Sequence, residues 1–151
     1  MTEPFAGVLD RAEALCRQRG ARLTPQRRQV LGIVCGAQRP LGAYEILDAL
    51  RTLLPGAAPP TVYRALEFLV GQGLVHRLET LHAFVGCARP NQPQPHAGQF
   101  LICRTCGAVR ELEDPAVSQS VQAAAAATGF RPEHPVVEIS GRCACCAGGP
   151  R

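Results

Sequence analysis

The stretch "TVYRALEFLVGQGLVHRLETLHAFVG", residues 61–86, joins a helical pattern to two short extended segments. Its first part places a set of apolar residues within one arc of a helix, and that arc is expected to face a core. The members of the arc are Val62, Ala65, Leu66, Leu69 and Val70. Gly73 is able to end the helix, and the residues after it predict a two-stranded wing.

Three more helices are predicted before this stretch. Apolar spacing predicts one over residues 4–19 and another over about 42–53, and between them Thr24 and Pro25 are a natural N-cap and first residue of a helix. The segment "PGAAPP", residues 55–60, is expected to interrupt the helical structure, so that the fourth helix begins at Thr61. Short helices with short connections, followed by a wing, describe a winged helix-turn-helix.

The fourth helix has the polar face that a DNA-recognition helix needs. Tyr63 and Arg64 lie opposite the apolar arc and Thr61 lies at the N-terminal end, where such helices contact bases. The candidate phosphate contacts are Arg22, Arg27 and Arg28. The charge distribution agrees, because residues 1–77 contain ten arginines against six acidic residues, whereas the rest of the chain is balanced. An amphipathic helix with a solvated face, and arginines that are plain surface charge, remain alternatives.

The second half of the chain predicts a small β-β-α-β lobe, which makes the whole chain α+β. "FLICRTCGAVREL" reads as strand, turn and strand, a helix follows from Asp114 and Pro115 to Gly129, and "HPVVEISG" is a further strand. Two C-x-x-C pairs, Cys103 with Cys106 and Cys143 with Cys146, are separated by 36 residues. If the last strand joins the sheet, the four thiolates can meet at one tetrahedral zinc ion. A Cys143/Cys145 pair is a tighter alternative.

Four more potential metal ligands lie between these two regions. They are His76, Cys87, His96 and Glu111. Two nitrogens, one sulfur and one carboxylate make an acceptable zinc set, but their spacing alone is a weak signal and each can be an ordinary residue. Cys16 and Cys35 lie on apolar helix faces and are expected in the core, and His82 and His134 match no ligand position.

Targeting signals and cysteine content restrict the class of protein. The N-terminus lacks the pattern of a signal peptide, and nothing approaches a membrane-spanning apolar run, so a cytoplasmic location is expected. Eight cysteines in the reducing cytosol favour metal or redox chemistry over a disulfide framework. A four-thiolate zinc site is closed to substrate, and no carboxylate is placed as a general base beside an open zinc position, so the chain is not expected to be an enzyme.

Several motifs in the same order resemble the ferric uptake regulator superfamily, and within it the branch of zinc uptake regulators. They are "LTPQRRQVL", "PPTVYRALEFLVGQGLVHR", "FLICRTCGAV" and the terminal C-x-x-C, which together cover about residues 5–146. The resemblance implies a winged-helix DNA-binding domain at 1–84, a hinge at 85–98 and a dimerisation domain at 99–151. By position, the four C-x-x-C thiols match a structural zinc site, and His76, Cys87, His96 and Glu111 match a regulatory zinc site at the hinge.

The function implied by this resemblance is zinc-dependent repression. A homodimer with two zinc ions per protomer would bind pseudo-palindromic double-stranded operators and repress zinc-uptake genes, with no membrane and no small organic ligand as partner. An iron- or peroxide-sensing regulator of the same superfamily is the nearest alternative. It is disfavoured because "PQPHAGQF" has a single histidine and because Cys87 offers a soft thiolate. A thiol-redox protein that uses Cys103 and Cys106 is the alternative from another class.

Overall fold

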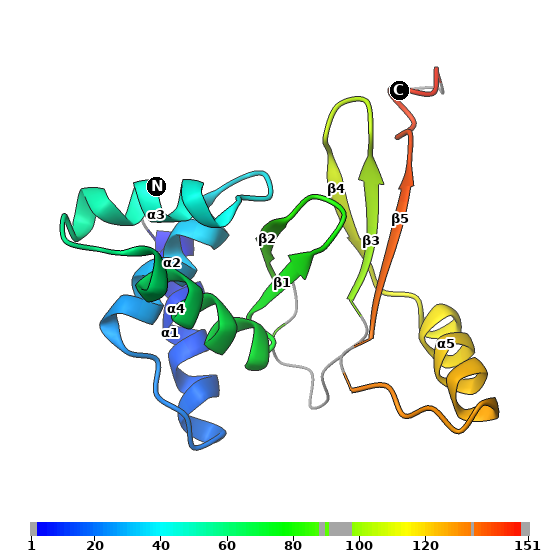
Figure 1. The fold of residues 1–151 in the computed structure, drawn as a ribbon, viewed down its shortest axis with the longest axis horizontal. Helices are drawn as coiled ribbons and strands as arrows, with labels where there is room; N and C mark the ends of the chain where they lie inside the picture. The colour runs from blue at the N-terminus through cyan, green and yellow to red at the C-terminus, as the bar shows by residue number, and fades with distance from the viewer. Residues whose placement is uncertain (1–2, 88–89, 91–97, 134, 149–151) are drawn as a thin grey trace. The chain divides into compact units, whose positions relative to one another are not determined.

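The chain forms two compact units, Met1–Asn91 and Gln92–Arg151, in a computed structural model that describes residues 3–87, 90, 98–133 and 135–148 (Figure 1). The boundary falls inside the predicted hinge at 85–98. The first unit contains α1 (Glu3–Gln18), α2 (Pro25–Gly36), α3 (Ala43–Leu53), α4 (Pro59–Gly71), β1 (Val75–Leu78) and β2 (Ala83–Gly86). Among the described residues, no helix is both long enough and apolar enough to cross a bilayer.

The core of the first unit lies where α2, α3 and α4 meet. The fully buried side chains there include Val30 and Leu31 on α2, Ile46 on α3, and Leu66 and Leu69 on α4, of which the last two belong to the predicted apolar arc. Burial of such side chains is the main favourable contribution to folding, at about 1.5–3 kcal/mol for each one. The three helices therefore hold the exposed face of α4 in a fixed orientation within this unit.

The wing packs directly onto this helical core. β1 and β2 are antiparallel, with His76 opposite Val85, and an isolated bridge between Leu41 and Phe84 extends the ladder. A Cβ atom added at Gly86 would lie 2.8 Å from the Sγ atom of Cys35, which is closer than such contacts are tolerated. Glycine at this position therefore allows the wing backbone to approach α2.

Two expectations for α4 were wrong in detail. The helix begins at Pro59, two residues before Thr61, because proline lacks only an N–H group that the first turn does not use. Val70 is 36% exposed rather than buried, since Leu69 is the last residue of α4 that packs into the core. The predicted end of the helix is confirmed by Gly73, whose φ of 70° lies in the left-handed region.

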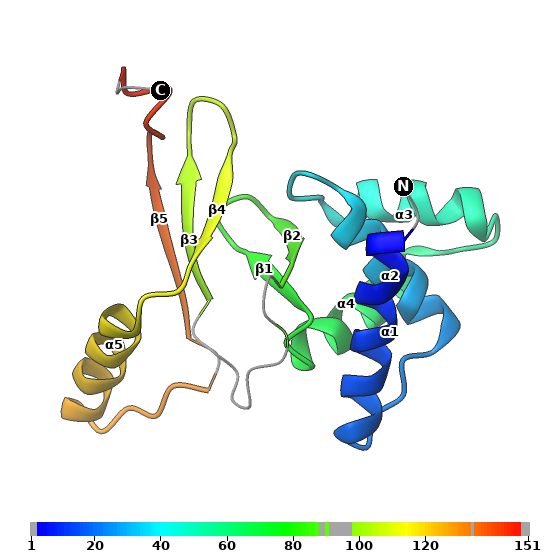
Figure 2. The same ribbon diagram turned by 180° about the vertical axis from the view of Figure 1, so that it is seen from behind.

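The second unit is a three-stranded sheet with one helix, as the pattern of the sequence predicts (Figure 2). Its elements are β3 (Gly98–Cys103), β4 (Val109–Leu112), α5 (Pro115–Ala127) and β5 (Val136–Gly141). The strand order is β4-β3-β5, with β4 antiparallel and β5 parallel to the central strand. Because Cys103 pairs with Gly141, β3 and β5 end at the same edge of the sheet.

A buried amide attaches α5 to this sheet. None of the residues of α5 is buried, whereas Gln99 on β3 is 3% exposed. Its Nε2 donates to the carbonyl oxygen of Asp114 at 3.0 Å and to Oγ of Ser118 at 2.8 Å, and its Oε1 accepts from the N–H of Asp114 at 3.3 Å. The start of the helix is thus held by hydrogen bonds more than by apolar packing.

Candidate metal centres and nucleic-acid interface

The four cysteines of the two C-x-x-C pairs lie together at the edge of the sheet where β3 and β5 end. Cys103 is the last residue of β3 and Cys106 follows in its turn, while Cys143 and Cys146 follow β5. Their Sγ atoms all lie within 4.8 Å of one another. The parallel register of β5 brings the two pairs together, because it places Gly141 beside Cys103.

The sulfur geometry fits a tetrahedral zinc ion. A Zn–S bond of about 2.3 Å implies sulfurs about 3.8 Å apart. The Sγ atoms of Cys106 and Cys143 are 3.7 Å apart, and none of the eight cysteines, all of which the structure describes, forms a disulfide. This separation is far longer than the S–S bond of about 2.05 Å in a disulfide. The donor set is thus suited to holding a metal ion.

The local backbone favours ionised sulfur at one corner of the cluster. The N–H groups of Cys106 and Cys143 lower the pKa of the Cys103 thiol to about 5, and the N–H of Cys143 lies 3.3 Å from its sulfur. The adjacent thiols of Cys143, Cys106 and Cys103 raise the pKa of Cys146 to about 12. Four thiolates at this spacing repel one another, so a cation is needed for all of them to ionise together.

Cys145 lies between two cluster cysteines but is not a member of the cluster. Its side chain is exposed, and the group of four thiols that could hold a metal ion does not include it. This arrangement supports Cys146 rather than Cys145 as the partner of Cys143. Cys16 is buried in the helical core as expected, and Cys35 is half-buried against the wing.

The first unit brings two of the other predicted ligands together. His76 lies on β1, and Cys87 follows β2 and donates its backbone N–H to the carbonyl oxygen of Leu74 at 2.9 Å. The Sγ atom of Cys87 and an imidazole nitrogen of His76 lie within 4.8 Å of each other, and both side chains are half-buried. Glu111 belongs to the second unit, on β4 opposite Phe100. His96 lies outside the described residues.

The exposed face of α4 carries the predicted base contacts. Tyr63 is 51% exposed, Arg64 is exposed, and Thr61 is half-buried within the first turn of the helix. Val62 and Ala65 alternate with them and are buried, which keeps the polar side chains pointing away from the core. A guanidinium and a phenol on one face are groups that bond to base edges and phosphates in the major groove.

The three arginines predicted as phosphate contacts have different surroundings. Arg28 is ion-paired with Asp10 at 2.7 Å and with Glu13 at 3.0 Å, which ties α2 to α1. The guanidinium of Arg27 lies 3.8 Å from the centre of the Phe68 ring and donates to the carbonyl oxygen of Arg22. The side chain of Arg22 is exposed, and it makes no polar contact within the part of the chain that the structure describes.

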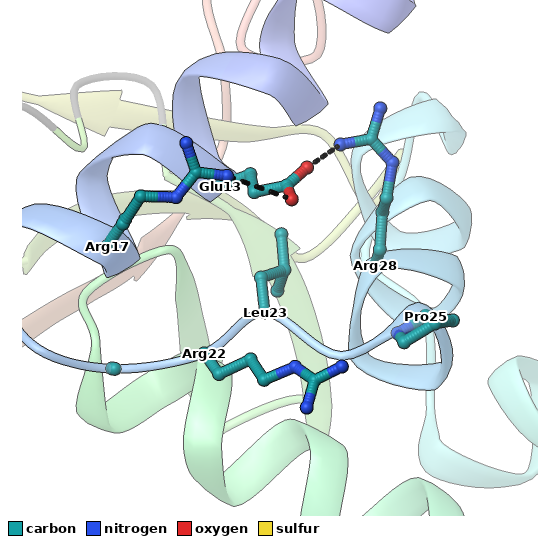
Figure 3. A pocket seen from close by; sticks show the side chains of 7 residues that line it. Glu13, Arg17, Arg22, Leu23, Pro25 and Arg28 are labelled. Atoms are coloured by element: carbon teal, nitrogen blue, oxygen red, sulfur yellow. Dashed lines mark hydrogen bonds and ion pairs between the residues drawn. The ribbon is translucent and has the colours of Figure 1, made fainter.

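A surface pocket of about 530 Å³ is lined by Arg22 and by Arg17, a basic residue that is not among the predicted phosphate contacts (Figure 3). Arg17, from the last turn of α1, lies beside Glu13, and Arg22, Leu23 and Arg28 complete much of the lining. The spacing of Glu13 and Arg17 in the sequence predicts only a helical ion pair, which the structure contains at 3.5 Å. Arg17 and Arg22 line the same pocket because the chain turns between α1 and α2.

Comparison with known proteins places these features in a family. The model of the ferric uptake regulator family matches residues 18–140. The zinc uptake regulation protein of Escherichia coli K12 is 44% identical over 139 residues, which are 92% of this chain and 81% of that protein.

Two of the solved structures that resemble this chain match it over at least 93% of its length. One is a zinc uptake regulator in complex with zinc and DNA, with a TM-score of 0.88 and 42% identity over 95% of both chains. The other is holo XcZur, with a TM-score of 0.83 and 46% identity over 93% of this chain and 96% of that one. The similarity therefore extends beyond the fold to the sequence of both units.

Proposed function

This chain belongs to the ferric uptake regulator family, and on that premise we propose that it is a zinc-responsive transcriptional repressor in the cytoplasm rather than an enzyme. The observation that carries the proposal is its similarity, over 95% of both chains, to a regulator that was solved with zinc and DNA. The exposed Tyr63 and Arg64 and the four-sulfur cluster are the groups that such a function uses.

The first proposed zinc ion is structural and is held by Cys103, Cys106, Cys143 and Cys146. It supplies the positive charge that lets four adjacent thiols ionise together. This ion fastens the turn after β3 to the segment after β5, in a unit whose helix buries none of its residues. Binding of zinc at such a site is coupled to folding, so its loss unfolds the lobe and removes the dimer.

The second proposed zinc ion is regulatory. Its ligands are His76 and Cys87, which lie close together at the wing, with His96 and Glu111 completing the set that the family resemblance implies. Zinc at this site selects the DNA-binding arrangement of the dimer, in which two α4 helices enter successive major grooves about 34 Å apart. Zinc and operator DNA must then strengthen each other's binding by the same coupling free energy, typically about 1–3 kcal/mol.

The proposal is tested by selecting binding sites from random DNA with protein held at buffered free zinc, and again after treatment with a mild chelator. We expect a pseudo-palindromic sequence to be enriched only when zinc is present, and native mass spectra to show a dimer that falls from four zinc ions to two. The variant His96→Ala should keep the dimer and its two tightly held ions but lose the zinc dependence. No enrichment at any zinc concentration would refute the proposal.

The same experiment separates the alternatives. An iron or peroxide sensor would bind operator DNA with Fe²⁺ or Mn²⁺ rather than with zinc. The thiol of Cys87 beside His76 favours zinc, because thiolate ligands select softer ions than carboxylates do. A thiol-redox protein would be purified without metal and lighter by two hydrogen atoms for each disulfide.

A further inference from the structure

Glu67 is the one acidic residue of α4, and it lies on the exposed face of that helix. It follows Arg64 by three positions and Tyr63 by four, so the three side chains share one face of the helix. A face that meets DNA gains affinity from positive charge, and a carboxylate there repels phosphates. The position of Glu67 therefore needs an explanation beyond solubility.

No described residue neutralises this carboxylate. Arg64 has the spacing for a helical ion pair, yet no hydrogen bond or ion pair of Glu67 occurs within the described residues. A groove of about 540 Å³ between α4 and the wing is lined by Glu67 and by Arg77, which is ion-paired with Glu79 at 3.1 Å. The groove also contains Tyr63 and His82, neither of which is a fixed positive charge.

From this arrangement we propose that Glu67 is a specificity-determining residue, whose carboxylate accepts a hydrogen bond from the exocyclic amino group of a cytosine in the operator. A carboxylate only accepts hydrogen bonds, and in the major groove Asp and Glu pair with cytosine N4. This inference rests on the proposed DNA-binding function and adds a base contact to it. It also explains why the carboxylate of Glu67 has no partner within the described residues, because its oxygens stay available to accept from the cytosine. If the DNA offered no donor to this carboxylate, its desolvation at the interface would weaken binding to every sequence.

The geometry of the helix gives the position of this base. Successive residues advance about 1.5 Å along the axis, so Glu67 lies roughly 4.5 Å beyond Arg64. Base pairs of B-DNA are about 3.4 Å apart. For an α4 that lies along the major groove, the base pair that Glu67 contacts is therefore the neighbour of the one that Arg64 contacts, on the side toward the C-terminal end of α4.

The test compares wild-type protein with Glu67→Gln and Glu67→Ala by selection from random DNA with zinc, followed by titration of all four bases at the affected position. Glu67→Gln should move the preference at one position of each half-site from cytosine to adenine, because an amide bonds to adenine N6 and N7. Glu67→Ala should weaken that preference by about tenfold or more. Glu133→Gln removes an equal charge from an exposed loop of the second unit and should change no base preference.

The outcomes separate this inference from the function on which it rests. If both Glu67 variants bind all sequences more tightly and keep every base preference, the carboxylate only repels phosphates and the inference is wrong. If the preference changes at a position that is not adjacent to the one lost in Arg64→Ala, the assigned geometry is wrong. Wild-type protein without zinc-dependent binding would refute the proposed function, and this inference with it.

Discussion

Replacing Gln99 by leucine should release the start of α5 from the sheet while leaving the four cysteines in place. The side chain makes three hydrogen bonds to Asp114 and Ser118, each with a net contribution of about 0.5–1.5 kcal/mol. Leucine at this position would bury apolar surface, and the groups of Asp114 that lose their partner can form hydrogen bonds with water. We therefore expect the free energy of opening α5 to fall by about 2 kcal/mol. β3 keeps its backbone hydrogen bonds to both neighbouring strands, so Cys103 should not move.

Hydrogen exchange measured by mass spectrometry on the zinc-loaded protein tests this expectation. A loss of about 2 kcal/mol corresponds to about 30-fold faster exchange in α5 peptides if α5 opens locally, with unchanged zinc content. Gln122→Leu is the matched control, because Gln122 is exposed on the same helix. Exchange in α5 that changes less than about threefold, or loss of zinc with α5 still protected, would contradict the reasoning.

Three other predictions follow from the sites. Cys103→Ser should lose the tightly held zinc ion and the folded second unit, whereas Cys145→Ser should keep both; metal analysis and circular dichroism measure the difference, and a stable, zinc-replete Cys103→Ser protein would exclude that thiol as a ligand. Arg64→Ala should lose about 1–3 kcal/mol of discrimination at one base pair, and equal weakening on all sequences would mean a phosphate contact instead. Burial raises the pKa of Cys35 to about 11, so at pH 8 its thiol stays protonated and should be alkylated far more slowly than the exposed thiol of Cys145. Mass spectra recorded at successive times measure the two rates, and equal rates would contradict this prediction.

The parts of the fold that local sequence determines could be predicted. Apolar periodicity placed the core face of α4 except for Val70, and glycine at 73 predicted where α4 ends, because a left-handed residue needs no tertiary partner. The pairing of β5 with β3 was expected only conditionally, since parallel strands are joined through a distant crossover. The structure supplies the register that puts Gly141 beside Cys103.

Features that depend on distant partners could not be predicted. The sequence presents Arg27 and Arg28 as two adjacent basic residues, and only the packing of α1 and α4 shows that one contacts Phe68 and the other Asp10 and Glu13. Likewise, a glutamine in a strand gives no sign that it is buried, because its partners lie in a helix start many residues later. Candidate ligands were found more readily than such contacts, since cysteine spacing is restrictive and arginine placement is not.

The parallel pairing of β5 with β3 also sets an order of events during synthesis. Cys103 and Cys143 are 40 positions apart, so β4 and α5 are made while only half of the four-sulfur cluster exists. Two thiols hold zinc far less tightly than four, so the zinc ion that we propose for this cluster would be firmly held only once β5 has paired along β3. Retention of this proposed zinc ion against a chelator would therefore indicate that β5 has joined the sheet. A chain on a ribosome stalled before Cys143 should lose its zinc ion to the chelator.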